Sequence, residues 1–417
     1  QMVNIFIHII ILISLIFASC ASTPPTQTFT LPTNSLAERI SAVENHIPVK
    51  EWFKWNEKTI ADRMEHYNVP GVSIAVVNNH KIEWAKGYGT LEIGSNKSVT
   101  PDTLFQAASV GKSLTATAAM HFAEAEFLSL DEDVNNQLVS WEITENWFTT
   151  NENVTLRRLL SHTAGMTVSG FRGYAEGKKI PNLLQILNGE PPANNETIRV
   201  DKTPGKGFRY SGGGFQVVQQ LLEDVQKEPF STIMQKTVLN PCGMTSSRYE
   251  LMLPEARKSI AATAHDFSGH PARGKWHNLA CFGAGRGLWT TPTDLASFGI
   301  EISEAYKGKT GKIISPQSAK VLLTPHSDAG ELGRQVKRYL PQICSQVYYG
   351  LGFVLCGEIK NFLFLHPGHN LPGFRSLLVM MPEKEQGIVI MANGEKGNSL
   401  ILEIFYSFAQ VYGWLQS

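Results

Sequence analysis

The sequence has no surplus of charge of either sign, because 37 Lys and Arg residues balance 37 Asp and Glu residues in a chain of 417. It therefore lacks the basic excess with which proteins neutralise phosphates, and no nucleic acid is expected as a partner. Five cysteines are too few for a small disulfide scaffold, and 42% hydrophobic residues exclude a disordered or collagen-like chain. We also find no repeats at solenoid or propeller periods. The composition indicates an ordinary globular protein.

Signals for a metal or a nucleotide are equally scarce. No H-E-x-x-H motif occurs, and His366 and His369 have no third ligand at a supporting spacing. The glycines of Gly283–Gly287 lead into a helix start near Thr291, whereas a dinucleotide-binding turn leads out of a strand. We expect neither a metal nor another cofactor.

An apolar run near the N-terminus, Ile5–Phe17, has about 13 residues and is too short for a spanning helix of about 20. It matches the hydrophobic part of an export signal, and Phe17-Ala18-Ser19-Cys20 at its end resembles the lipobox of bacterial lipoproteins. The resemblance implies a signal peptide over residues 1–19, a lipid on Cys20 and a tether over residues 20–46. The exported protein would then be anchored to a membrane of the periplasm or cell envelope. Plain secretion and an uncleaved anchor are the alternatives.

The remaining four cysteines leave the disulfide pattern open. In an oxidising compartment, Cys242, Cys281, Cys344 and Cys356 can pair in three ways. The alternative is that at least two of them are buried free thiols.

Hydrophobic periodicity predicts a sheet built from both ends of the chain around a helical middle. The expected elements are a helix over 49–67, a hairpin of 72–77 and 82–88, a helix over 109–127, strands over 349–355, 362–365, 374–380 and 387–392, and a closing helix over 400–412. This pattern predicts one domain of mixed α/β (α+β) class over residues 47–417. Its α/β part would comprise residues 47–108 and 300–417, and its helical part residues 109–299.

Ser109 is followed three residues later by Lys112, at the start of the helix predicted over 109–127. Residues i and i+3 share one face of a helix, so the Lys amine can approach the Ser hydroxyl and act as its base. The helix N-terminus favours negative charge on the Ser oxygen or on an attacked carbonyl. The pair therefore indicates a nucleophilic serine. Taken alone, it is also compatible with a helix-capping Ser and a solvated Lys.

Two further segments contain candidate functional residues. Tyr210 begins the run Tyr210-Ser211-Gly212-Gly213-Gly214. Beside a Lys ammonium, its hydroxyl would be a candidate general base. The alternative is that Tyr210 is a half-buried structural residue. The segment His366-Pro367-Gly368-His369 lies between two strand-like runs. A strand edge beside a nucleophile can offer a backbone N–H to an oxyanion and a polar side chain to a substrate.

Taken in order, Ser-x-x-Lys, Tyr-Ser-Gly and His-x-Gly resemble the penicillin-recognising serine hydrolases, which include class C β-lactamases, D,D-peptidases and family VIII esterases. The resemblance spans roughly residues 47–415 and includes the phrases Leu159–Met166, Asn240–Met244, Gly285–Leu295 and Pro372–Phe374. It implies a β-lactamase/transpeptidase-like fold, with an antiparallel sheet from both termini, flanking helices and a helical subdomain.

The resemblance also implies roles for the candidate residues. Ser109 would be the acylated nucleophile, Lys112 its activating partner, and Tyr210 the proton shuttle for the leaving group and the deacylating water. The N–H groups of Ser109 and His369 would form the oxyanion hole. His366 would orient Tyr210 or a substrate carboxylate, and the substrate-binding set would also include Ser211, Gly368 and His369.

Two departures from the family pattern weigh against efficient β-lactamase activity. Gly212 stands where many members have Asn, and Pro367 stands where Thr, Ser or Gly is usual. We therefore expect an exported serine hydrolase that forms an acyl-enzyme with small-molecule or peptide substrates containing an ester or amide bond, such as D-amino-acid peptides. A true β-lactamase, a penicillin-binding or sensor protein with little turnover, and an inactive scaffold are the alternatives.

Overall fold

The computed structural model describes residues 35–49, 54–175, 177–272, 287–357 and 362–415. The predicted export signal, Cys20, most of the tether, Cys281 and Gly283–Arg286 lie outside these residues. Within the described ranges, no helix combines the length and apolar character that crossing a membrane requires.

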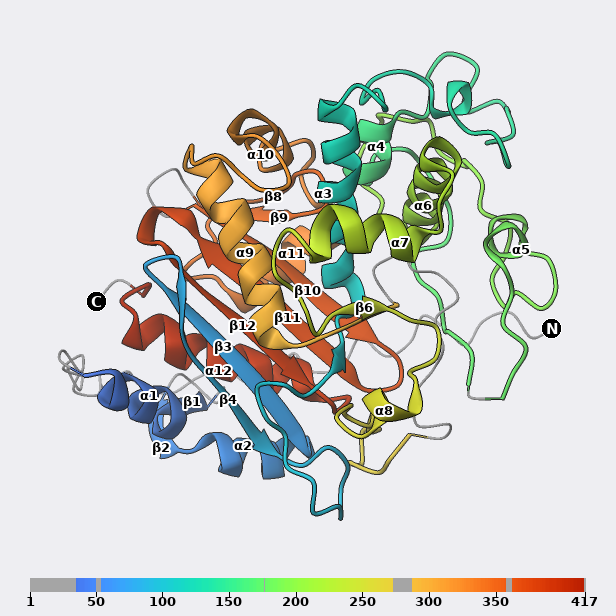
Figure 1. The fold of residues 1–417 in the computed structure, drawn as a ribbon. Helices are drawn as coiled ribbons and strands as arrows, with labels where there is room; N and C mark the ends of the chain where they lie inside the picture. Colours follow the sequence, from blue (N-terminus) through green and yellow to red (C-terminus); the bar gives the residue numbers. More distant parts are fainter. Residues whose placement is uncertain (1–34, 50–53, 176, 273–286, 358–361, 416–417) are drawn as a thin grey trace, which may run out of the picture.

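A seven-stranded antiparallel sheet forms the centre of the molecule (Figure 1). The pairing of β3 with β12 joins the two ends of the chain in one sheet, as predicted. In spatial order the strands are β4 (Lys81–Gly89), β3 (Gly71–Asn78), β12 (Gln386–Ala392), β11 (Phe374–Met381), β10 (Leu363–Asn370), β9 (Val354–Cys356) and β8 (Val347–Tyr349).

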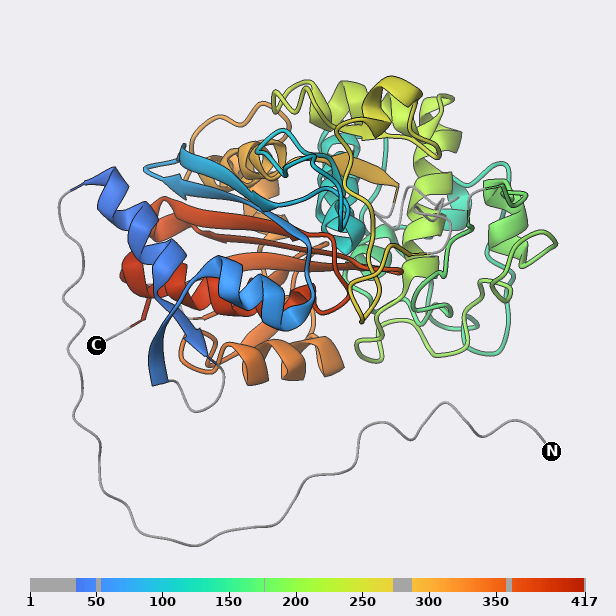
Figure 2. The same ribbon diagram turned by 90° about the horizontal axis from the view of Figure 1, so that it is seen from below.

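Helices cover both faces of this sheet, which Figure 2 shows nearly edge-on. We call the face covered by α1 (Leu36–Asn45), α2 (Ile60–Tyr67), α11 (Gly330–Tyr339) and α12 (Gly397–Val411) the back face, and the face covered by α9 (Pro292–Tyr306) the front face. Alternate strand residues enter separate hydrophobic clusters: Ile388 and Ile390 of β12 pack in the back cluster, Val389 and Met391 in the front cluster.

The helical part lies beside one end of the sheet (Figure 1). Its helices are α3 (Gly111–Glu124), α4 (Leu156–Leu160), α5 (Leu183–Asn188), α6 (Gly212–Gln226), α7 (Phe230–Met234) and α8 (Glu255–Lys258). A further helix, α10 (Pro316–Leu322), packs against α9 and α3. Shorter elements are the 3-10 turns η1 (Ala108–Val110), η2 (Val134–Asn136) and η5 (Pro382–Lys384) and the π-helix η3 (Gln235–Leu239). Two small sheets pair β5 (Phe105–Gln106) and β6 (Arg248–Tyr249) with β7 (Leu288–Thr290), and β1 (Ile47–Val49) with β2 (Lys54–Lys58).

The helix predicted over 49–67 is wrong in its first half. Thr59 and Asp62 form a capping box, in which each side chain accepts the other residue's backbone N–H, and this cap begins α2 at Ile60. The preceding residues 54–58 pair with 47–49 as β2 and β1.

Three other boundaries differ from the prediction. The strand expected over 349–355 is the hairpin of β8 and β9. Residues 36–45 of the predicted tether form α1, and the Ser407 hydroxyl of α12 donates to the Val43 carbonyl at 3.1 Å. Helix α9 already covers the sheet from Pro292, so the chain returns to the α/β part before residue 300.

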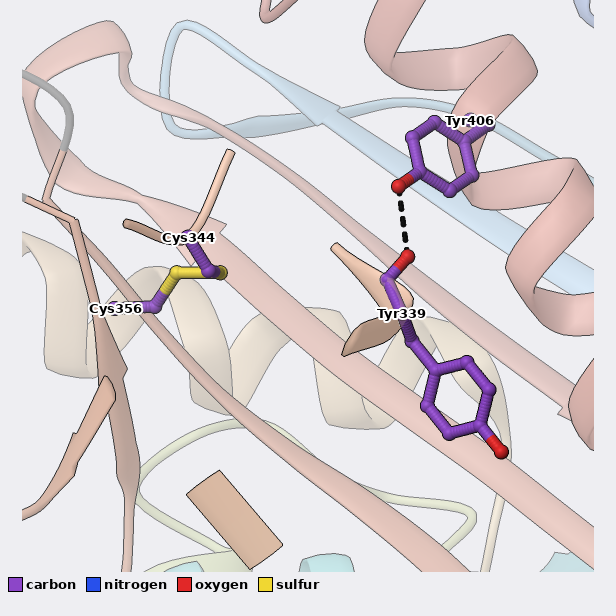
Figure 3. Close-up of a disulfide and its surroundings, with 4 residues drawn as sticks. All are labelled: Tyr339, Cys344, Cys356 and Tyr406. Carbon is purple, nitrogen blue, oxygen red and sulfur yellow. Dashed lines mark hydrogen bonds between the residues drawn. A yellow bond between two sulfur atoms is a disulfide. The ribbon is translucent and has the colours of Figure 1, made fainter. Parts of the chain in front are cut away.

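The cysteines divide into one disulfide and one free thiol among those the structure describes. Cys344 and Cys356 form a disulfide that links the segment after α11 to β9 (Figure 3). Close to it, the Tyr406 hydroxyl donates to the Tyr339 carbonyl at 2.7 Å and joins α12 to the end of α11. Cys242 is buried, and burial raises the pKa of its thiol.

Candidate active site

Ser109 lies on the turn η1, immediately before α3, and is 8% exposed. The preceding residue, Ala108, has a φ of 52°, in the left-handed region that residues with a Cβ rarely adopt. Such strained residues persist where the surrounding structure holds them, and they collect at functional sites. The chain therefore presents Ser109 from an unusual, fixed turn.

Lys112 follows in the first turn of α3 and is almost completely buried, with 1% of its surface exposed. Its Nζ donates a hydrogen bond of 3.1 Å to Ser109 Oγ, so the predicted contact between the two side chains is present. The same Nζ lies 4.9 Å from the ring centre of Tyr210 and 5.6 Å from that of Phe215. The ring faces stabilise the cation electrostatically.

Tyr210 lies directly before α6 and is the second predicted residue that the fold brings to Lys112. Ser211, its neighbour, is 3% exposed and caps α6: its hydroxyl accepts the Gly214 N–H at 2.9 Å and donates to the Thr167 carbonyl at 2.7 Å. Because both roles of this hydroxyl are fulfilled inside the protein, Ser211 contributes to local structure, and its predicted contact with substrate is not supported.

His366 lies on β10 and is 1% exposed. Its Nε2 bonds to the Tyr349 hydroxyl at 3.1 Å and its Nδ1 to the Pro367 carbonyl at 2.7 Å. Burial and the charge of Lys112 lower the pKa of His366 to about 3, so the ring is neutral and accepts the Tyr349 proton. Both ring nitrogens of His366 are thus bonded to groups of the protein, and the expectation that His366 orients Tyr210 or a substrate carboxylate stays a prediction.

Gly368 is the point where β10 touches the segment that leads to Ser109. A Cβ placed on Gly368 would lie 2.5 Å from the Ala107 carbonyl oxygen and 2.0 Å from Ser376 Oγ, so only glycine allows this approach. The Ser376 hydroxyl donates to the same Ala107 carbonyl at 2.6 Å. The strand that carries the His369 N–H is thus held against the turn that carries the Ser109 N–H.

The His369 side chain, in contrast, is half exposed and lies 3.6 Å from Glu395 through Nε2. Arg375 forms an ion pair with the same carboxylate at 2.5 Å. Burial acts to raise the pKa of Glu395, but the contacts with His369 and Arg375 outweigh it and lower this pKa. The Glu395 carboxylate is therefore charged and attracts the imidazole.

Sequence reasoning missed two residues of this site. Tyr349 is completely buried, and burial together with Tyr210 raises the pKa of its hydroxyl, which keeps it protonated. His162 is 2% exposed, and its ring centre lies 4.3 Å from that of Tyr210. His162 stood within a family phrase, Leu159–Met166, but nothing in its spacing placed it beside a residue about 50 positions away.

The arrangement can support acyl transfer. A serine hydroxyl is hydrogen-bonded to a buried amine, and a tyrosine ring lies against that amine. The strand that contains His369 meets the segment before Ser109 at Gly368, which is where the predicted oxyanion hole would lie. The geometry brings together Ser109, Lys112, Tyr210 and the Gly368–His369 segment, and it assigns Ser211 and His366 to supporting contacts.

Comparison with known proteins gives the same picture. A family model described as Beta-lactamase matches residues 56–406. Protein flp of Staphylococcus aureus (strain N315) is 22% identical over 343 residues, which make up 81% of this chain and 62% of that protein. The unguisins hydrolase ungD' of Aspergillus campestris is 26% identical over 220 residues, which make up 48% of this chain and 37% of that protein. The chain thus spans about three-fifths of the length of flp.

Two solved structures have similar folds. The octameric penicillin-binding protein homologue from Pyrococcus abyssi has a TM-score of 0.69 and 23% identity, covering 85% of this chain and 76% of that one. A penicillin binding protein from Bacillus halodurans has a TM-score of 0.63 and 19% identity, covering 83% and 98%. These likenesses confirm the predicted fold. Since the family model matches most of the chain and includes all three motifs in the predicted order, the chain belongs to the beta-lactamase family of penicillin-recognising serine hydrolases.

Proposed function

We propose that the protein is a serine hydrolase that cleaves ester or amide bonds through an acyl-enzyme. The observation that carries this proposal is the 3.1 Å hydrogen bond between Lys112 Nζ and Ser109 Oγ in a buried site. Withdrawal of the hydroxyl proton toward Lys112 and Tyr210 makes the Ser109 oxygen a nucleophile at neutral pH.

The reaction proceeds in two balanced steps. The Ser109 oxygen bonds to the substrate carbonyl, the bond to the leaving group breaks, and Tyr210 returns the proton to the departing oxygen or nitrogen. Water then attacks the acyl carbon and gives one proton to the same groups. The bond between the acyl carbon and Ser109 Oγ breaks, the carboxylic acid leaves, and Ser109 Oγ takes up that proton. The N–H groups of Ser109 and His369 stabilise the negative oxygen in both steps.

Small esters and amides suit this site better than β-lactams. At position 212 many relatives in the resembled family have Asn, but a Cβ on Gly212 would lie 3.2 Å from both Phe171 and the Ser169 carbonyl, so a longer side chain is crowded there. Pro367 has no hydroxyl for a β-lactam carboxylate. A hydrogen bond to a charged group contributes about 1.5–3 kcal/mol, so its absence costs roughly tenfold or more. The second candidate is a β-lactamase or penicillin-binding sensor, which is favoured by the two structural neighbours, a penicillin-binding protein homologue and a penicillin binding protein.

One activity panel tests the proposal. The purified protein and its Ser109→Ala variant are offered a short-chain p-nitrophenyl ester, a D-Ala-D-Ala peptide and a chromogenic cephalosporin, and both are treated with a serine-directed fluorophosphonate. We expect the wild type to be labelled and to have a higher kcat/KM for the ester than for the cephalosporin, and Ser109→Ala to lose label and turnover. Retained labelling of Ser109→Ala contradicts the nucleophile. A clearly preferred cephalosporin makes the second candidate the function, and stoichiometric acylation without turnover indicates a sensor.

We further propose that the protein is exported and held on a membrane by a lipid on Cys20. Two or more acyl chains give stable anchoring, whereas one gives marginal binding. Mass spectrometry of the mature N-terminus should find a diacylglycerol on Cys20, and Cys20→Ser should move the protein from the membrane fraction or leave it unprocessed. An unmodified Cys20 in the mature protein contradicts this.

A further inference from the structure

His162 holds the backbone on both sides of Tyr210. Its carbonyl accepts the N–H of Arg209 at 2.7 Å, and its Nδ1 accepts the N–H of Ser211 at 3.1 Å. A single residue therefore binds the backbone N–H groups of both neighbours of Tyr210.

The His162 ring also packs against Tyr210 itself. The ring centres are 4.3 Å apart with the planes at 39°, and Phe215, Tyr349 and Phe208 surround the imidazole at 5.3, 5.0 and 5.6 Å. This packing limits how far the Tyr210 ring can move away from Lys112, whose amine lies over the same ring.

The conformation and surroundings of His162 are energetically unfavourable. Its φ is 58°, a left-handed conformation, and it is buried with 2% of its surface exposed. Burial and the charge of Lys112 lower its pKa well below the usual value, so the imidazole is neutral. A neutral ring that accepts at Nδ1 carries its proton on Nε2, and among the described residues Nε2 has no hydrogen-bond partner. A buried donor without a partner is rare and calls for an explanation.

We propose that His162 is the positioning residue for Tyr210, through the bond from Nδ1 to the Ser211 N–H and the contact between the two rings. The inference rests on the proposed role of Tyr210 as the proton donor to the leaving group. His162 makes no contact with substrate in this proposal: it sets the direction of the Tyr210 hydroxyl.

This role predicts an effect that depends on the leaving group. p-Nitrophenolate leaves without being protonated, whereas an alkoxide needs a proton as it leaves. A misplaced Tyr210 therefore slows the hydrolysis of an ethyl ester much more than that of a p-nitrophenyl ester of the same acid. A general loss of folding or of Ser109 reactivity slows both esters by the same factor.

The experiment compares kcat/KM for these two esters in five proteins. We expect Tyr210→Phe and His162→Ala each to lower the ethyl-ester value at least tenfold more than the p-nitrophenyl value. The double variant should have the same ratio as Tyr210→Phe, because the two residues act through one group. The control is His265→Ala, since His265 is a buried histidine like His162, and its ring nitrogens bond to Ile93 and Asn393. His265→Ala should change kcat/KM for both esters by the same factor.

Two conservative variants separate positioning from folding and keep the test valid if His162→Ala does not fold. His162→Asn offers an acceptor near the place of Nδ1 and tolerates the left-handed backbone. His162→Asn should recover, on a logarithmic scale, at least half of the loss in the ratio of the ethyl-ester kcat/KM to the p-nitrophenyl-ester kcat/KM. His162→Phe, which has a ring but no acceptor, should not.

The proposal is overturned if His162→Ala lowers kcat/KM for both esters by the same factor. It is also overturned if the double variant discriminates between the two esters more strongly than Tyr210→Phe does, or if His162→Asn recovers no more of the loss than His162→Phe. If Tyr210→Phe itself leaves the ratio unchanged while Ser109→Ala is inactive, the proton-donor role of Tyr210 and this inference are both overturned and the serine mechanism stands. If Ser109→Ala stays active, the proposed function itself is wrong.

Discussion

The two faces of the central sheet each bury a cation, and they treat it differently. On the back face, Arg63 of α2 bonds both oxygens of Glu403 of α12, at 2.8 and 3.1 Å, and Tyr67 donates to the same carboxylate at 2.6 Å. Beside the front face, Lys112 bonds a hydroxyl and lies over two aromatic rings. The Glu403 carboxylate neutralises the buried charge of Arg63, whereas the contacts of Lys112 include the hydroxyl of Ser109, the proposed nucleophile. We expect the first arrangement to stabilise the fold and the second to serve the proposed reaction.

The largest expected effect comes from removing the front-face cation. Lys112→Met retains the length of the side chain without its charge, and we expect kcat for the ester to fall by about 10²–10⁴-fold, the usual cost of losing a proton-transfer group. The free energy of unfolding should not fall, because a buried charge is replaced by an apolar group of similar volume. Steady-state kinetics and urea denaturation measure the two quantities. A kcat within tenfold of the wild type contradicts the assigned role, and a large loss of stability contradicts the comparison.

The opposite result is expected on the back face. Glu403→Ala leaves Arg63 buried without its anion, which typically costs about 3–5 kcal/mol of unfolding free energy. Activity per folded molecule at a temperature where the variant is folded should stay at the wild-type level, because Glu403 lies in α12 on the back face, whereas Lys112 lies in α3 beside the front face. The control is Glu228→Ala, which removes the exposed ion pair with Lys236 and should have almost no effect. A strong loss of kcat in Glu403→Ala contradicts the separation of the two faces.

The sequence predicted best what depends on neighbours along the chain. The contact of Ser109 with Lys112 needs a single helical turn, and the hairpin of β3 and β4 needs a short turn between two apolar runs. The helix over 49–67 failed for a local reason as well. Its apolar spacing continued through 52 and 55, but the capping box at Thr59 starts the helix and the preceding residues pair with β1.

The supporting residues of the site were beyond such reasoning, because their partners are distant. His366 bonds Tyr349, and the Ser211 hydroxyl bonds the Thr167 carbonyl across 44 positions. A side chain that resembles a substrate ligand in a motif can have all its hydrogen-bonding capacity used within the fold. Periodicity and spacing contain no information on that outcome, which depends on packing.

The smallest effect concerns the proton balance of the front face. Burial and the charge of Lys112 lower the pKa of His366 from 6.5 to about 3. The unfolded chain takes up a proton at this imidazole below about pH 6.5, whereas the folded protein does so only near pH 3. The contribution of His366 to stability is therefore complete above pH 6.5 and is lost as the pH falls through this range. By pH 5 the loss is about 2 kcal/mol.

His366→Gln sharpens this prediction, because glutamine does not titrate and still offers an oxygen to the Tyr349 hydroxyl. Urea denaturation at about pH 7.5 and about pH 5 should show the variant losing about 2 kcal/mol less than the wild type between the two values. The carboxylates titrate in both proteins, so they cancel in the difference. Equal losses would mean that the folded protein accommodates a charged His366 beside Lys112. The front face would then tolerate a second buried cation beside Lys112, and His366 would not contribute to the pH dependence of stability.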